Sequence, residues 1–301
     1  MNYAELLFPD FSLILAGYLV CRLTALNRSV WQPVEALVYY LLFPVLLFHS
    51  IVKTPIEVGE MSRLMAAGLA MTAGGIALSQ LLARLPGLRQ RIAPREHAGA
   101  AQVAFRFNTF VALALADRLA GAAGLQLVAV LVGVCVPLVN LAAVWPMAHH
   151  GNQRVLRELA RNPLVIATVS GLACNLAGLQ LPGWATPPLQ RIGASAIALG
   201  LMAAGAGLQW GHLQHNRTLS AVVLTIRHLL LPLWAWALVR LMGLDATQSA
   251  VLMAFSALPT ASSCYVLAVR MGYNGPYVAG LITLSTLLAL ASLPLALGVL
   301  R

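Results

Sequence analysis

The chain has 301 residues, of which 60% are hydrophobic and only 9% are charged. Soluble domains carry about 25% charged residues, so this composition excludes a water-soluble globule and requires lipid as part of the solvent. The net charge of +10 does not indicate a nucleic-acid partner, because the arginines lie singly or in small groups at the ends of apolar runs.

Ten apolar runs follow one another along the chain, separated by short loops that are rich in proline, glycine and charge. A transmembrane helix needs roughly 20 predominantly apolar residues, which is about the length of each run. Loop residues of these types end helices. We therefore predict an all-α integral membrane protein with ten spans, at 5–24, 33–52, 62–83, 97–117, 123–147, 162–180, 188–209, 218–241, 246–269 and 277–299.

The distribution of basic residues predicts the orientation of these spans. With the N-terminus outside, eleven arginines fall on the inner side and six basic residues on the outer side, while Arg106 and Arg227 lie within spans. Basic residues accumulate on the cytoplasmic side of membrane proteins. We therefore expect both termini to lie on the outer side.

Ten spans divide as five plus five, at 1–150 and 151–301. An odd number in each half gives the halves opposite orientations, which is the inverted-repeat arrangement of many secondary transporters. The fourth span contains "FRFNTFVALALADR" and the corresponding ninth span contains "FSALPTASSCYVLAVR". Each has a polar cluster, then an aromatic residue, then a Val/Leu/Ala run. We predict that both helices are broken at these clusters and cross each other.

The polar residues of the two breaks form the predicted substrate site. Pro259 removes a hydrogen bond from a helix interior, and helix N-termini at a break suit an anionic group. Arg106 can hold a carboxylate through two parallel hydrogen bonds, unless it lies near enough to the surface to reach water. The predicted substrate-binding residues are Arg106, Asn108, Thr109, Pro259, Thr260, Ser262, Ser263 and Cys264.

Arg227 and His228 lie inside the eighth span, shortly before Pro232. Two interpretations stay open. In the first, Arg227 adds a second positive charge to the substrate site, and His228 titrates near neutral pH and couples protons. In the second, Arg227 is structural and satisfies carbonyls that the proline frees. No Asp or Glu occupies the middle of a span, which disfavours a sodium or proton site and favours an anion carrier.

In these segments the chain resembles the auxin efflux carrier family, and its bacterial members in particular. "FRFNTFVALALADRLAG" and "SALPTASSCYVLAVRMGYN" look like the two crossover segments of that family. "YYLLFPVLLFHSIVKTP" resembles its second span, and "NPLVIATVSGLACNLAGLQLP" resembles the start of its second half. The resemblance implies a fold like that of bile-acid/sodium symporters and sodium/proton antiporters.

The resemblance also implies a mechanism. Spans one, two, six and seven would form a scaffold, often dimeric, and spans three to five and eight to ten a transport unit that moves like an elevator. Bacterial relatives are associated with small organic anions such as dicarboxylates, and plant relatives with indole-3-acetate. The chain departs from the family pattern at Arg106, which stands near a position where glycine is frequent, and at Ser262, Ser263 and Cys264, where other members can carry amides.

We therefore expect a secondary active transporter of a small organic anion, a carboxylate, in a bacterial cytoplasmic membrane. A homodimer through the scaffold helices is expected, with no cofactor, no metal and no enzymatic activity. The alternative is a carrier of the same fold for a different solute, such as an amino acid or a cation-coupled cargo. An intramembrane enzyme using Ser256, Ser262 or Ser263 with His228 is disfavoured, because the sequence shows no strained nucleophile turn and no orienting acid.

Overall fold

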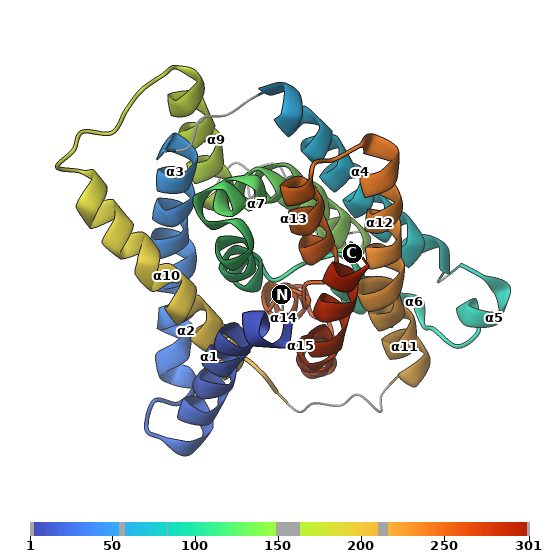
Figure 1. Ribbon diagram of the computed structural model, residues 1–301. Helices are drawn as coiled ribbons and strands as arrows, with labels where there is room; N and C mark the ends of the chain where they lie inside the picture. Colours follow the sequence, from blue (N-terminus) through green and yellow to red (C-terminus); the bar gives the residue numbers. More distant parts are fainter. Residues whose placement is uncertain (1–2, 54–57, 83, 149–162, 210–215, 300–301) are drawn as a thin grey trace. The chain divides into compact units, whose positions relative to one another are not determined.

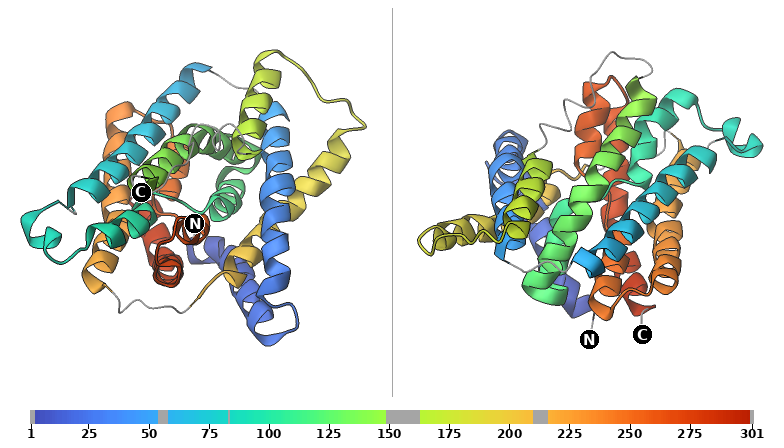
Figure 2. Two further views of the ribbon diagram at one scale, coloured as in Figure 1. Left: turned by 180° about the vertical axis from the view of Figure 1, so that it is seen from behind. Right: turned by 90° about the horizontal axis from the view of Figure 1, so that it is seen from above.

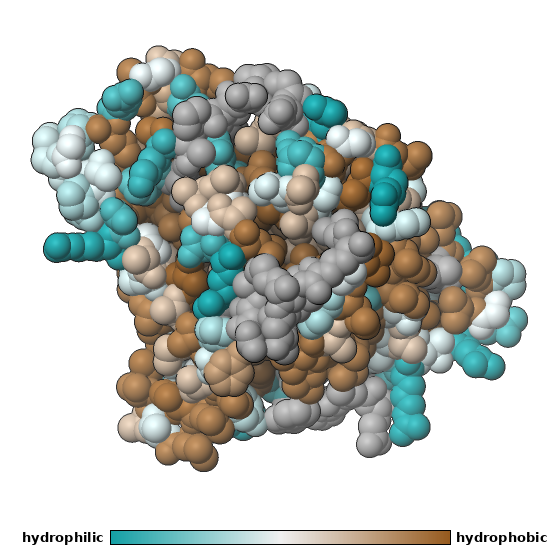
Figure 3. Space-filling view, viewed as in Figure 1, coloured by the Kyte–Doolittle hydropathy of each residue, from teal (hydrophilic) through white to brown (hydrophobic). Residues whose placement is uncertain are grey.

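The computed structural model describes residues 3–53, 58–82, 84–148, 163–209 and 216–299, and every regular element in these residues is a helix (Figure 1). Among these described residues, six stretches are long and apolar enough to cross a membrane: Arg28–Lys53, Met61–Leu81, Pro94–Met147, Thr186–Ala206, Arg217–Met242 and Gly275–Gly298. Hydrophobic side chains also cover most of the face seen in Figure 3. The prediction of an all-α, multi-pass membrane protein is confirmed.

The helices agree with the ten predicted spans in position but not always in length. Helices lie in all ten predicted ranges, but several are shorter than a bilayer requires, such as α9 (Pro163–Leu176) and the apolar part of α1 at Phe11–Leu23. Ten spans and an inverted repeat therefore stay predictions. So does the orientation, because the basic loop at 149–161 lies outside the described residues.

The chain divides into two compact units that are interleaved along the sequence. The first comprises Met1–Met65, Phe110–Val136 and Leu156–Gly207, and the second comprises Ala66–Thr109, Pro137–Val155 and Leu208–Arg301. Each unit thus draws on both halves of the sequence. The assignment of spans one, two, six and seven to a scaffold, and of the other spans to a transport unit, stays a prediction.

In the first unit, glycines allow α1 (Tyr3–Leu23) and α10 (Thr186–Ala206) to cross in direct contact (Figure 1). A Cβ atom on Gly17 would collide with the main chain of Met202, and one on Gly205 with the main chain of Ile14. These two contacts run in opposite directions along the helices, so the pair is antiparallel. Small residues are the usual means of such close approach in membranes, where apolar surface alone does not favour helix association.

A second group of helices in this unit packs around α3 (Phe43–Lys53), which contacts both α9 and α10. Gly193 of α10 lies against Leu46, and Gly171 of α9 lies against Ile51. The Asn175 amide donates a 2.7 Å hydrogen bond to the main-chain carbonyl of Ile51.

Two of the apolar helices contain a π-helical turn that the sequence analysis did not predict. One, η1 (Val38–Leu42), joins α2 (Arg28–Leu37) to α3, and the other, η3 (Ile226–Leu230), joins α11 (Arg217–Thr225) to α12 (Leu231–Met242). Each ends two residues before a proline, Pro44 or Pro232. Because proline has no N–H to donate, the helix makes wider i→i+5 bonds just before it, from Phe43 to Val38 and from Leu231 to Ile226.

In the second unit, the part of α4 (Val58–Leu82) that follows Met65 packs along α12, where Gly75 leaves room for Leu231 and the Trp234 indole donates to the carbonyl of Ala70 at 3.1 Å. The final helix, α15 (Gly275–Gly298), contacts α13 (Ala246–Ser256), α14 (Ser263–Arg270) and η3 (Figures 1 and 2).

Both predicted helix breaks are present in this unit. After the short helix α5 (Pro86–Arg89), α6 (Pro94–Ala100) continues as the 3₁₀ turn η2 (Ala101–Ala104) and then stops; residues 105–108 are not helical. The helix α7 (Thr109–Ala148) begins directly afterwards and kinks at Gly121, whose φ is 55°. The second break, residues 257–262, separates α13 from α14.

Candidate functional site

The two helix breaks meet within the second unit. The main-chain N–H of Asn108, at the end of the first break, donates a 2.9 Å hydrogen bond to the carbonyl of Pro259 in the second. Next to this bond, the rings of Phe107 and Phe255 pack with their centroids 4.3 Å apart. The Gln102 amide donates to the carbonyl of Cys264 at 3.2 Å. Main-chain, aromatic and amide contacts therefore fix one break against the other.

Arg106 lies in this crossing and is held by three side chains from three different segments. Its guanidinium donates to Oε1 of Gln102 at 3.0 Å, to Oδ1 of Asn140 at 3.1 Å and to Oγ of Ser263 at 3.1 Å. Gln102 belongs to η2, Asn140 to the second half of α7, and Ser263 to the first turn of α14. Arg106 thus organises the crossing.

The positive charge of Arg106 has no carboxylate partner in the described part of the chain. All three of its acceptors are neutral oxygens. A guanidinium has five N–H donors, so three hydrogen bonds leave two donors free. The side chain is partly exposed, so these donors are within reach of a solute.

The predicted binding residues fall into two groups by exposure. Arg106, Thr109 and Ser262 are partly exposed and Ser263 is exposed, so all four can contact a solute. The others are buried: Asn108, Pro259, Thr260, Cys264 and Arg227. A carboxylate at the crossing would thus meet the guanidinium, hydroxyl groups and the first N–H groups of α14, an end that carries partial positive charge.

Arg227 lies next to the second break and contacts main-chain carbonyls, whereas Arg106 contacts side chains. It is 1% exposed, and its Nε and Nη2 groups donate to the main-chain carbonyls of Leu258 and Phe255 at 2.6 and 3.2 Å. These contacts are of the kind that the structural interpretation expects. The carbonyls, however, lie in the last turn of α13 and in the break at Pro259, and not in the helix turn before Pro232.

Sequence reasoning missed two residues of this cluster, Gln102 and Asn140. Gln102 lies four residues before Arg106, a spacing that brings side chains together on one helix face and was a usable signal. Asn140 is a single amide in the apolar run "PLVNLAAV". Nothing in that run indicates which helix the amide faces.

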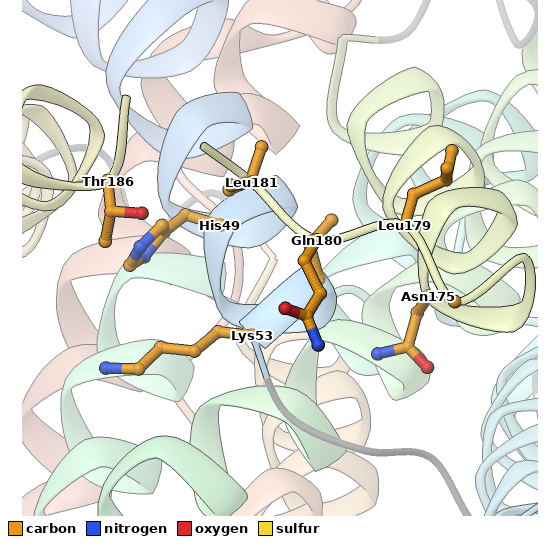
Figure 4. Close-up of a pocket in the computed structure, with 9 residues that line it drawn as sticks. His49, Lys53, Asn175, Leu179, Gln180, Leu181 and Thr186 are labelled. Atoms are coloured by element: carbon orange, nitrogen blue, oxygen red, sulfur yellow. The ribbon is translucent and has the colours of Figure 1, made fainter. Parts of the chain in front are cut away.

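A separate cavity of about 570 Å³ lies in the first unit, where α3 and α9 end and α10 begins (Figure 4). Its lining includes His49, Lys53, Asn175, Gln180 and Thr186. The Lys53 ammonium complements the carbonyl ends of α3 and α9, which carry partial negative charge. No predicted site residue lines this cavity, so the helix crossing is the candidate site.

Residues 143–297, slightly more than half of the chain, match the model of a family described as "membrane transport protein". The chain is also 24% identical over 298 residues to a protein from Methanothermobacter thermautotrophicus described as an uncharacterized transporter. That alignment covers 98% of this chain and 97% of the archaeal protein.

Proposed function

Because the chain belongs to the membrane transport protein family, that of the auxin efflux carrier-like transporters, we propose that this transporter moves a small organic anion. The anion is a carboxylate, bound at the crossing of the two helix breaks. Transport is secondary active and takes place across the cytoplasmic membrane of a bacterium.

One observation carries the choice of an anion, namely the unpaired charge of Arg106. A guanidinium in a membrane span costs several kcal/mol and persists where it has a function or a partner. Here its described partners are neutral, and two donors remain for a ligand. The remaining donors are Nε–H and one Nη1–H, because Nη2 donates to both Asn140 and Ser263. A carboxylate that accepts from either of them makes a charge-assisted hydrogen bond, which is roughly twice as strong as a neutral one.

The division into two compact units supports an elevator-type mechanism. Arg106 and all of its described partners belong to the second unit, as do both helix breaks. A unit that carries the complete set of contacts can move without releasing the solute. The first unit, held by the glycine contacts of α1 and α10, would be the scaffold, and its helices would form the homodimer interface.

Transport can be tested in proteoliposomes, with acetate, succinate, citrate and benzoate each tested in turn. The vesicles are loaded with the unlabelled compound, and entry of its labelled form from outside is measured. We expect saturable exchange of at least one compound, lost in Arg106→Gln and retained in Arg240→Gln. Arg240 is an exposed arginine at the end of α12, so its substitution removes one charge without touching the crossing.

Two outcomes would contradict this proposal. Exchange that is equally fast in Arg106→Gln would place the solute elsewhere. If no carboxylate is exchanged, exchange of neutral amino acids, or of a solute that absolutely requires sodium, would favour the alternative of a carrier with a different cargo.

A further inference from the structure

The second helix break leaves main-chain groups without helical partners, and the structure supplies partners from other segments. The groups with such a partner are the carbonyls of Phe255, Ala257, Leu258 and Pro259 and the N–H of Thr260. In the interior of a membrane protein, groups of this kind must be paired within the protein. The partner of Pro259 is Asn108, as described above, and the other four depend on one short stretch of chain.

Arg227 provides two of these partners. In a regular helix the carbonyl of Phe255 would accept from the residue four positions later, but that residue is Pro259, which has no N–H. The Arg227 guanidinium donates to this carbonyl at 3.2 Å and to that of Leu258 at 2.6 Å. Its positive charge also complements the partial negative charge at the C-terminal end of α13.

His228 reaches the remaining two groups through serines of α15. Its Nε2 lies 2.8 Å from Oγ of Ser285, which accepts from the N–H of Thr260 at 3.0 Å. Its Nδ1 lies 2.9 Å from Oγ of Ser292, which donates to the carbonyl of Ala257 at 3.3 Å. One side chain thus connects both sides of the break.

The directions of these hydrogen bonds assign one form of the imidazole. Ser292 uses its own hydrogen on Ala257, so its oxygen must accept from Nδ1–H. A neutral ring with its proton on Nδ1 has an unprotonated Nε2, so the Ser285 hydroxyl can donate to Nε2 while its oxygen accepts from Thr260. The neutral Nδ1–H tautomer satisfies every member of this network, and a second proton on the ring would displace the Ser285 hydroxyl from its acceptor.

The π-helical turn explains how adjacent residues serve one break. Arg227 and His228 both lie in η3. A π-turn contains more residues than an α-helical turn, so consecutive side chains are separated by a smaller angle around the axis. In the wider turn before Pro232, Arg227 faces the end of α13 and the break, and His228 faces α15, whose serines bond the same break.

From these contacts we propose that Arg227 and His228 are positioning residues that hold the second break in its substrate-binding form. This rests on the proposed function of the crossing. Neither residue contacts the solute, and His228 carries no proton during transport. Their effect reaches the solute through Pro259, which pairs with Asn108, and through Ser263, which pairs with Arg106.

The positioning role can be measured without knowing the substrate, through the reactivity of Cys264. This thiol is fully buried directly after the break, and Cys21, Cys135 and Cys174 can be replaced by alanine to leave it as the one cysteine. In that background we expect N-ethylmaleimide to label Cys264 about tenfold faster in Arg227→Met, His228→Leu and Ser285→Ala, because each loses bonds that hold the break closed.

Conservative variants separate positioning from general instability. Arg227→Lys keeps a donor and His228→Gln keeps one donor and one acceptor, so both should label at nearly the parent rate, as should the surface control Arg240→Met. Should Arg227→Met fail to fold, Ser285→Ala and His228→Leu still report on the same break. Labelling of Arg227→Met, His228→Leu and Ser285→Ala at the parent rate would overturn the proposal, whether or not any carboxylate is transported.

Whether His228 carries a proton during transport can be tested separately. Glutamine cannot take up a proton, so a carrier that moves protons on His228 would lose the pH dependence of exchange in His228→Gln. We expect His228→Gln to keep the pH profile of the unaltered protein for whichever of acetate, succinate, citrate and benzoate it exchanges. A flattened profile would show that His228 is a proton carrier and would overturn that part of the proposal.

Discussion

The main chain of Asn108 donates a 2.9 Å hydrogen bond to the main-chain carbonyl of Pro259, 151 residues later in the sequence. This bond joins two interrupted helices at the points where each lacks its own hydrogen bonds. Arg106 and Ser263 lie on either side of it and are themselves paired. The backbone groups that make the crossing polar therefore also stabilise it. The crossing also holds Arg106, whose positive charge is available to bind an anion.

Asn140 should matter for binding although it lies in an apolar run. Its Oδ1 accepts from the Arg106 guanidinium at 3.1 Å. In Asn140→Leu, which keeps the branched shape of the side chain, Arg106 loses one acceptor, and we expect a loss of about 1–3 kcal/mol in stability together with weaker carboxylate binding. Thermal unfolding and binding titrations on the purified protein measure both effects.

The control for this variant is Asn175→Leu. Asn175 also holds a neighbouring helix, through the carbonyl of Ile51, but it lies in the first unit. It should lower stability by a similar amount while leaving carboxylate affinity unchanged. Equal loss of affinity in both variants would mean that Asn140 acts only through general stability.

Ser263 should contribute a smaller, specific effect. Its exposed hydroxyl accepts from Arg106 at 3.1 Å and stands at the first turn of α14. Ser263→Ala removes one neutral acceptor, so we expect carboxylate affinity to fall by about 0.5–1.5 kcal/mol, or roughly two- to twelvefold. Ser195→Ala, which removes a hydroxyl bonded to its own helix in the first unit, is the matched control. An unchanged dissociation constant in Ser263→Ala would exclude this hydroxyl from the site.

The contact of α1 with α10 should depend on glycine. A side chain at Gly205 has no space, because the main chain of Ile14 occupies it. Gly205→Val should therefore force the helices apart and cost about 1–3 kcal/mol or more of the free energy of unfolding. Gly183→Ala, at a position with no neighbouring atom within 4 Å, should leave the unfolding midpoint nearly unchanged. Equal midpoints for the two variants would contradict the observed packing.

The sequence was sufficient to locate both helix breaks, because Asn108 and Pro259 stand within polar clusters that interrupt long apolar runs. Composition likewise predicted an all-α membrane protein. The role of Arg227 could not be decided in advance, since the carbonyls it binds belong to a helix that follows some 30 residues later, and only tertiary packing brings them together. The π-turns before Pro44 and Pro232 were missed because a proline in an apolar run indicates that a helix is interrupted but does not specify how its hydrogen bonds rearrange.

Binding of carboxylates to Arg106 is the central claim, and a thermal-shift experiment tests it most directly. Purified protein, Arg106→Gln and Arg240→Gln would each be unfolded with and without acetate, succinate, citrate or benzoate. A ligand that binds the folded state at 100 times its dissociation constant stabilises it by about 2.7 kcal/mol, which raises the midpoint measurably. We predict that at least one carboxylate raises the midpoint of the unaltered protein and of Arg240→Gln but not that of Arg106→Gln. Equal shifts in all three proteins would contradict the assignment of the site, and no shift with any carboxylate would contradict the choice of an anion.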